Sequence, residues 1–203
     1  MAPSAYDGRM DSSIQTIAAA GIGLGLAAAC GFRVFVPLLV LSLAAKGGYV
    51  ALAPGWAWIG TMPAVIAFGT ATLLEAFGYF IPWVDHALDL VATPAAVAAG
   101  MVTTASVLTD LPPLVRWAAI LVGGGGLAAL VQSSTVALRA GSTATTGGLA
   151  NPVVAAVELG GSALTSILAV LLPLVALLAV IVGLAVFWLV VRRVGGRHRP
   201  RAA

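Results

Sequence analysis

The chain alternates long apolar runs with short polar breaks, and the runs are long enough to cross a lipid bilayer. The first run covers residues 14–45, about 32 residues, where about 20 suffice for a transmembrane helix. Because Pro37 and several glycines interrupt it, we expect this run to tilt, kink or break. Further apolar runs cover residues 63–82, 90–108 and 114–139. This pattern predicts an all-α integral membrane protein, a bundle of transmembrane helices some of which are broken.

Short segments rich in glycine, proline, tryptophan or acids separate these runs. Lys46 and two glycines close the first run, and the loop after them holds two tryptophans, which are typical of the headgroup region. The polar segment WVDHALD follows Pro82, and Asp110 begins a turn that contains two prolines. Together with a polar N-terminal tail at residues 1–13, these breaks predict three spans before a fourth that ends near Arg139.

The longest polar, glycine-bearing stretch lies at residues 142–158 and reads STATTGGLANPVVAAVE. Asn151 followed by Pro152 predicts a helix start, with the Asn side chain accepting free backbone N–H groups and Pro at the first helical position. Glu158 lies about 10 Å further along this helix, at about 1.5 Å per residue. A carboxylate at that depth in a membrane span is expensive unless it is partnered, so Glu158 is a candidate functional residue.

Residues 152–191 contain no polar loop, and two interpretations stay open. Either Pro173 marks a tight turn between a fifth and a sixth span, or residues 151–161 form a re-entrant half-helix before one long kinked span. The first interpretation gives six transmembrane helices and the second gives five.

Internal similarity favours six spans. GLGLAAA at residues 23–29 resembles GGGLAAL at residues 124–130, and each is followed by a glycine-containing connection and a span that begins and ends at proline. Residues 14–108 and 114–192 would then form a 3+3 inverted repeat within one transmembrane domain at residues 14–193, as in many transporters. In this topology both termini are cytoplasmic.

Composition excludes a soluble globule. Of 203 residues, 61% are hydrophobic and only 8% are charged, and the runs lack the alternating pattern of a transmembrane barrel. The single cysteine, Cys30, excludes a disulfide framework, and no cofactor motif is present. We expect a multi-pass protein of the cell (inner) membrane.

Positive charge is concentrated at the C-terminal end, within a basic tail at residues 194–203 and just before it. This distribution predicts a cytoplasmic C-terminus that contacts anionic membrane lipids, and it lacks the aromatic interleaving expected for nucleic-acid binding. The residues concerned are Arg192, Arg193, Arg197, Arg199 and Arg201.

Arg33, Glu75 and Glu158 are the charges that lie furthest inside apolar runs. Buried charges of opposite sign are tolerated in lipid when they pair or line water, so we expect an Arg and Glu cluster. The six-span topology places both acids about 10 Å from the same cytoplasmic side. The cluster is interpreted either as part of a polar path or as a buried ion pair that fixes helix register.

Two polar groups have competing interpretations. Asp85, His86 and Asp89 form either a weak candidate metal site or proton relay, or a helix start that favours acids. The segment containing Thr145, Thr146, Gly147, Gly148 and Asn151 forms either an anion-binding nest or a helix break whose free backbone groups meet threonine hydroxyls.

Three stretches of the chain combine these charged, glycine and proline positions. They read GFRVFVPLL at residues 31–39, EAFGYFIPWVDHALD at 75–89 and ATTGGLANPVVAAVE at 144–158. In these stretches the chain resembles the domain-of-unknown-function family 4126, small multi-pass bacterial membrane proteins. The resemblance implies no established activity. It marks as motif positions Arg33, Glu75, Pro82, Asp85, Asp89, Gly147, Gly148, Asn151, Pro152 and Glu158. Many relatives place a second acid where this chain has Leu159, so a two-acid metal site there is doubtful.

These features favour a channel or secondary transporter for a small ion or solute, with the buried acids along a polar path. The alternatives are a structural, assembly or lipid-binding membrane protein and, with least support, a metal-dependent enzyme using Asp85, His86 and Asp89. Faces rich in small residues permit close helix packing within one subunit or in a homo-oligomer.

Overall fold

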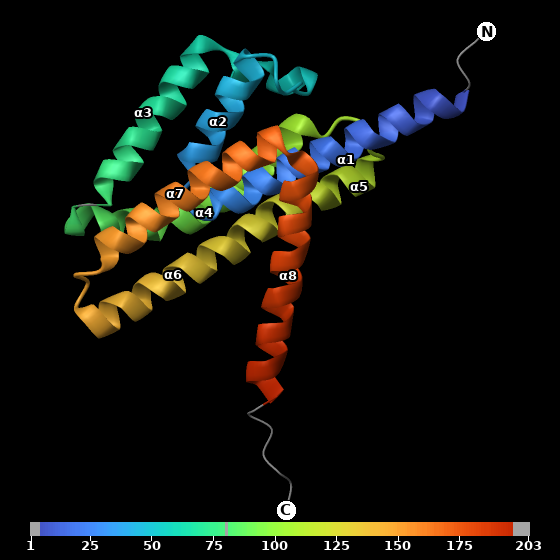
Figure 1. The fold of residues 1–203 in the computed structure, drawn as a ribbon. Helices are drawn as coiled ribbons and strands as arrows, with labels where there is room; N and C mark the ends of the chain where they lie inside the picture. The colour runs from blue at the N-terminus through green and yellow to red at the C-terminus, as the bar shows by residue number, and fades with distance from the viewer. Residues whose placement is uncertain (1–4, 80, 197–203) are drawn as a thin grey trace, which may run out of the picture.

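The computed structural model describes the backbone of residues 5–79 and 81–196, and the side chains of residues 12–79, 81, 88, 91–189, 192 and 193. All regular structure within these residues is helical, as the sequence predicts. Figure 1 shows a bundle of helices that run roughly side by side, with α8 leaving it at a steep angle. The helices are α1 (Ala5–Cys30), α2 (Phe35–Lys46), η1 (Pro54–Gly60), α3 (Met62–Gly78), α4 (Pro82–Val107), α5 (Pro113–Ala118), η2 (Ala119–Gly126), α6 (Leu127–Thr146), α7 (Asn151–Leu171) and α8 (Pro173–Gly196).

Proline defines most of the helix starts. η1, α4, α5 and α8 begin at a proline, and in α3 and α7 proline is the second residue. Proline lacks a backbone N–H and fixes φ near its helical value, so it suits a first turn where no N–H has an intrahelical partner.

Among the described residues, three helical segments are long and apolar enough to cross a membrane: Ser12–Cys30, Pro113–Thr146 and Asn151–Leu171. A fourth is obtained if η1 and α3, which meet at a 64° bend, count as one span. Further apolar helices at Phe35–Lys46, Val91–Val107 and Pro173–Leu189 are shorter. The chain is therefore a helical membrane protein, and the finer number of six spans stays a prediction.

The first apolar run breaks, as expected. α1 ends at Cys30, four residues follow without helix, and α2 begins at Phe35. α2 then runs back along the bundle, because Tyr49, shortly after its end, lines the same cavity as Gln15 near the start of α1. The run therefore folds into two antiparallel helices where one span was predicted.

This extra pass changes which segments share an end of the molecule. Gln15 in α1 and Asp110 in the turn before α5 line one cavity of about 330 Å³. The six-span topology placed the N-terminal end and this turn on opposite sides of the membrane, whereas the fold places both at one end of the bundle. Figure 1 shows the start of α1 and α5 at the same end.

The boundaries of three polar segments also differ from the prediction. α6 continues to Thr146 and does not end near Arg139, so the break before α7 comprises only residues 147–150. Residues 83–89 belong to the first turns of α4, and residues 5–13 are helical and not an irregular tail. In each case, the helix continues past the apolar run into a polar segment of the sequence.

The two interpretations of residues 152–191 are now distinguished. α7 is continuous for 21 residues, and the chain leaves helical geometry at Leu172 (φ −134°, ψ 65°) before Pro173 begins α8. The re-entrant half-helix is therefore wrong, and Pro173 does separate two helices. The inverted repeat stays a prediction, because α2 and η1 separate α1 from α3, whereas only a four-residue turn separates the continuous segment Pro113–Thr146 from α7.

Candidate functional site

Arg33 lies in the break between α1 and α2 and is almost fully buried, with 2% of its surface exposed. Its Nη2 donates a hydrogen bond of 2.9 Å to the carbonyl oxygen of Ala155 in α7. The same nitrogen lies 3.5 Å from Oε2 of Glu158, one turn further along α7. The break therefore places a guanidinium against the first turns of α7.

Glu158 forms its closest ion pair with Arg139 of α6. Arg139 Nε donates to Glu158 Oε1 at 3.0 Å, and Arg139 Nη2 hydrogen-bonds to Oε2. Both side chains are buried. A two-pronged pair of this kind fixes the geometry of both groups, and here it joins α6 to α7 inside the bundle. Glu158 thus lies between two arginines.

Tyr79, directly after α3, contacts both arginines through its ring. The guanidinium carbon of Arg33 lies 3.8 Å from the ring centroid and that of Arg139 lies 4.1 Å from it. A guanidinium over an aromatic face is attracted by the ring's negative quadrupole, and the attraction is stronger away from water. Tyr79 therefore links the end of α3 to the two cations.

Glu75 has a different role from Glu158. Its Oε1 accepts the backbone N–H of Val34 at 2.9 Å, and its Oε2 accepts that of Phe35 at 3.1 Å. These N–H groups belong to the first turn of α2, where they have no intrahelical partner and the helix dipole favours a negative charge. Glu75 of α3 therefore caps α2 from outside that helix.

Arg33, Glu75, Tyr79, Arg139 and Glu158 are called the charged cluster below. The sequence predicts that Arg33 and both acids gather, and the fold brings them to one region at the helix break. Two positive and two negative side chains are present, so the formal charge of the cluster is zero. Arg33 Nε and Nη1 are buried and meet no hydrogen-bond partner among the described residues.

A cavity reaches this cluster from the side of α3 and α4. It has a volume of about 600 Å³, and Glu75 and Tyr79 contribute to its lining together with apolar residues of both helices. The Tyr79 ring, which stacks with both guanidiniums, therefore lies next to unfilled space.

Sequence reasoning missed Arg139 and Tyr79. The apolar pattern predicts that the fourth span ends near Arg139, but α6 continues for two more turns. A signal was present, because Gln132, Thr135 and Arg139 recur at helical spacing and all three are buried on one face of α6. Tyr79 carried no comparable signal, since its position depends on how α3 ends.

Buried hydroxyl groups extend the polar interior beyond the cluster. On α7, Ser162 and Ser166 follow Glu158 at four-residue intervals, and Ser162 Oγ donates to the carbonyl of Ala29 in α1 at 3.0 Å. On α4, Thr104 Oγ1 donates to the carbonyl of Gly23 at 3.3 Å. These hydroxyls have no exposed surface. The helix contacts around α1 are therefore partly polar.

The turn between α6 and α7 is closed by its own groups. Thr146 Oγ1 donates to the carbonyl of Ser142 at 2.8 Å and accepts the N–H of Ala150 at 3.2 Å. Gly147 and Gly148 have φ values of 64° and 90°, which glycine tolerates best. The N–H groups of Gly147, Leu149, Asn151, Val153 and Val154 donate to carbonyls of the same turn. This geometry favours the helix-break interpretation over an anion nest.

Asn151 begins α7 as predicted, but it does not cap the helix. Ala150 occupies the N-cap position without a side-chain hydrogen bond. Asn151 Nδ2 instead donates to Thr143 Oγ1 at 3.1 Å and ties the two helix ends together. Thr145 Oγ1 bonds back to the carbonyl of Gly141 at 2.9 Å.

A family model described as Domain of unknown function (DUF4126) matches residues 20–193. The chain belongs to this family. The searches of curated proteins and of solved structures find no match. All five residues of the charged cluster and the turn between α6 and α7 lie inside the DUF4126 region.

The other acidic group of the DUF4126 region lies on the first turns of α4. Asp85, His86 and Asp89 have helical backbone, but their side chains lie outside the described residues. Among the side chains that are described, no group of three His, Cys, Asp or Glu residues is close enough to hold a metal ion. A metal site at this position stays a prediction.

Proposed function

We propose that this protein carries a small ion or solute across a membrane and that the charged cluster is the closed gate of its route. The observation that carries the proposal is the burial of Arg33, Arg139 and Glu158 in contact with one another at a helix break. Ionisable groups inside a membrane bundle are costly, and they typically belong to substrate or ion pathways.

The broken helix supports the same function. Transporters hold anionic groups at the N-termini of discontinuous helices, where free N–H groups point at the ligand. Here the N-terminus of α2 points at the carboxylate of Glu75, supplied by the protein itself. In this position the carboxylate of Glu75 accepts the free N–H groups at the start of α2 while the gate is closed.

The charges favour a small anion as the cargo. Arg33 and Arg139 both face Glu158, so a cation that approaches this carboxylate meets two positive groups first. If Glu158 turns away or takes a proton, the two guanidiniums need a new negative partner. Arg33 Nε and Nη1 already lack an acceptor among the described residues. An entering anion satisfies these donors.

Flux measurements in liposomes test the proposal. We expect the purified protein to pass small anions such as chloride, nitrate or formate, and Glu158→Gln and Glu75→Gln to change that flux about tenfold or more. Asp110→Asn, an exposed acid at the other end of the bundle, is the matched control and should behave as the unchanged protein. Size-exclusion profiles establish that each variant is folded. Unchanged flux in both glutamate variants, or no flux of any tested anion, proton or cation, contradicts the proposal.

A structural role is the second candidate, and one observation favours it. Both carboxylate oxygens of Glu75 and both of Glu158 have donors within the protein, as a buried register-fixing pair requires. In that case liposomes that contain the unchanged protein show no flux. The two glutamate variants then differ from the unchanged protein in stability and not in flux.

A further inference from the structure

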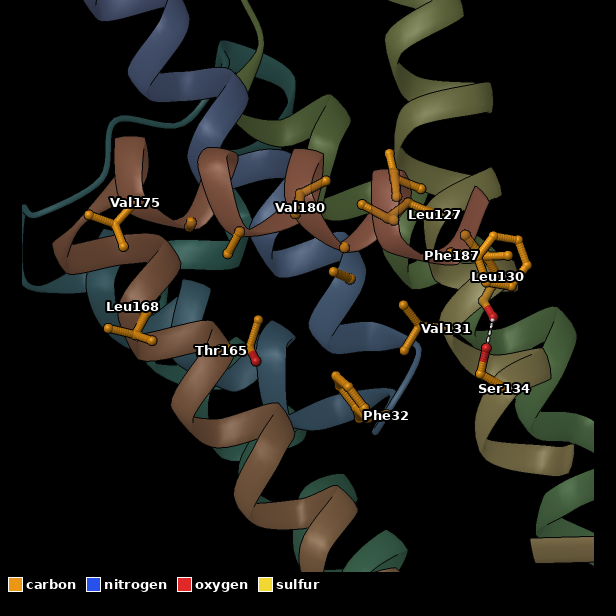
Figure 2. Close-up of a pocket in the computed structure, with 15 residues that line it drawn as sticks. Phe32, Leu127, Leu130, Val131, Ser134, Thr165, Leu168, Val175, Val180 and Phe187 are labelled. Atoms are coloured by element: carbon orange, nitrogen blue, oxygen red, sulfur yellow. Dashed lines mark hydrogen bonds between the residues drawn. The ribbon is translucent and has the colours of Figure 1, made fainter. Parts of the chain in front are cut away.

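α8 leaves the bundle and encloses an apolar groove on one side. Within its described residues Ala176 is buried, Leu177 and Val180 are half-buried, and the other large apolar side chains from Leu174 to Leu189 are exposed. The groove has a volume of about 390 Å³ and lies between α8, the end of α1, α6 and α7. Figure 2 shows Val180 and Phe187 of α8 on one side, with Val131 and Phe32 among the residues that face them.

The lining of this groove suits an apolar chain and offers little to a polar ligand. Ser134 and Thr165 are its polar side chains within the described part of the chain. Ser134 Oγ donates to the carbonyl of Leu130 at 2.9 Å, as the dashed line in Figure 2 shows, so its proton is already used. The remaining lining residues are aliphatic, aromatic or glycine.

Positive charge follows directly at one end of the groove. Phe187 lines it, and Arg192 lies five residues later, about 7.5 Å along the helix. The guanidinium of Arg192 lies 4.8 Å from the ring centroid of Trp188, and Arg192 and Arg193 are both exposed. Tryptophan and arginine next to an apolar helix are typical of the headgroup level of a bilayer.

We propose that this groove binds one acyl chain of an anionic phospholipid, whose phosphate contacts Arg192 and Arg193. The apolar walls take the chain, and the two arginines complement the negative headgroup. A second copy of the chain fits less well, because an apolar helix face in the groove gives Arg192 and Arg193 no negative partner. This inference does not depend on the proposed transport.

Gly183 provides the sharpest variant for a test. It lines the groove, and a Cβ added to it meets no atom within 4 Å, so Gly183→Phe places a ring in the groove without a backbone clash. Gly160 of α7 is the matched control, because its Cβ also meets open space and it lies outside the groove. The double variant Arg192→Gln/Arg193→Gln tests the headgroup contact.

The measurement is lipid retention by native mass spectrometry of the full-length protein, with phosphatidylglycerol and phosphatidylcholine of identical acyl chains as probes. We expect one phosphatidylglycerol to be retained at least fivefold better than phosphatidylcholine. Gly183→Phe should reduce retention of both about tenfold, Gly160→Phe should leave it unchanged, and the double arginine variant should abolish the headgroup preference. Equal retention of the two lipids by the unchanged protein overturns the proposal. So do equal effects of the two glycine variants, or a dimer that only Gly183→Phe dissociates.

Discussion

At the scale of single residues, the charged cluster is tolerable because its cations are arginines. A guanidinium is planar and weakly hydrated, so it can stack on Tyr79 while its edges form ion pairs and hydrogen bonds. Arg33 uses Nη2 for Glu158 and Ala155 and its face for Tyr79. A lysine in place of Arg33 or Arg139 offers no such face, and its compact charge is costlier to bury. The chemistry of arginine therefore permits two like charges to share one carboxylate.

Removal of Glu158 should cost more than removal of its whole ion pair. Glu158→Gln leaves Arg139 buried without its counter-charge, and we expect a loss of about 3–5 kcal/mol in the free energy of unfolding. The double variant Arg139→Gln/Glu158→Gln keeps one buried positive and one buried negative group, so most of this loss should disappear. Unfolding of the detergent-solubilised proteins, followed by circular dichroism, provides the comparison. A double variant as unstable as the single one is the contrary result.

The composition of the cluster was only partly predictable from sequence. Arg33, Glu75 and Glu158 stand out because each is a charge inside an apolar run. Their partners do not, because Arg139 lies near the polar end of its run and Tyr79 is an uncharged residue among other aromatic residues. The capping of α2 by Glu75 was also inaccessible, since it depends on α3 passing the end of a helix that the pattern did not separate from α1.

At the scale of helices, glycine sets how closely elements approach. A Cβ on Gly100 of α4 would lie 2.6 Å from the carbonyl oxygen of Gly124 in η2, and a Cβ on Gly124 would lie 2.6 Å from that of Gly100. Two backbones therefore touch with no side chain between them, as small residues permit in membrane bundles. The π-helical geometry of η2 occurs where α5 and α6 join through four consecutive glycines.

Gly124→Ala should separate α4 from η2. The added Cβ would lie 2.6 Å from both the carbonyl oxygen of Gly100 and Oγ1 of the buried Thr104. Since the Gly100 oxygen is part of the α4 backbone and cannot move independently, we expect overpacking to destabilise the protein by about 1–3 kcal/mol. Gly126→Ala is the control in the same segment, because its Cβ would lie 3.9 Å from the nearest atom, at ordinary contact distance. It should be neutral or slightly stabilising, given the higher helix propensity of alanine. Thermal unfolding in detergent measures both, and equal midpoints for the two variants would refute this account of the crossing.

Helix breaks were the most predictable feature at this scale. Proline predicted the start of α7 and, in one of two interpretations, that of α8, because its missing N–H and fixed φ act locally. The separation of α2 from α1 was expected only as an interruption. The direction in which α2 runs depends on contacts with other helices, and a local sequence pattern contains no information about these contacts. The same limit explains why the pattern did not predict the extension of α6 past Arg139.

At the scale of the whole molecule, the turns between helices gather at two opposite ends of the bundle. The start of α1 and the turn at Asp110 share one end, since Gln15 and Asp110 line the same cavity. The turn between α6 and α7 lies toward the other end, where Figure 1 also shows α3 ending and α4 beginning. The basic residues after α8 favour a cytoplasmic C-terminus. The side of the membrane on which the C-terminus lies stays a proposal, because α8 diverges from the bundle.

Cysteine labelling decides how these ends relate to the membrane. We expect an impermeant thiol reagent to reach Gln15→Cys and Asp110→Cys from the same side and Thr145→Cys from the opposite side, because α2 adds a pass between residues 15 and 110. The native Cys30 is buried and provides an unlabelled background. Intact and permeabilised cells give the two conditions. Labelling of positions 15 and 110 from opposite sides would restore the six-span topology and show that α2 does not return through the bilayer. If all three positions react from one side, the segment from α5 to α6 does not cross the membrane, and a route through the charged cluster loses its physical basis.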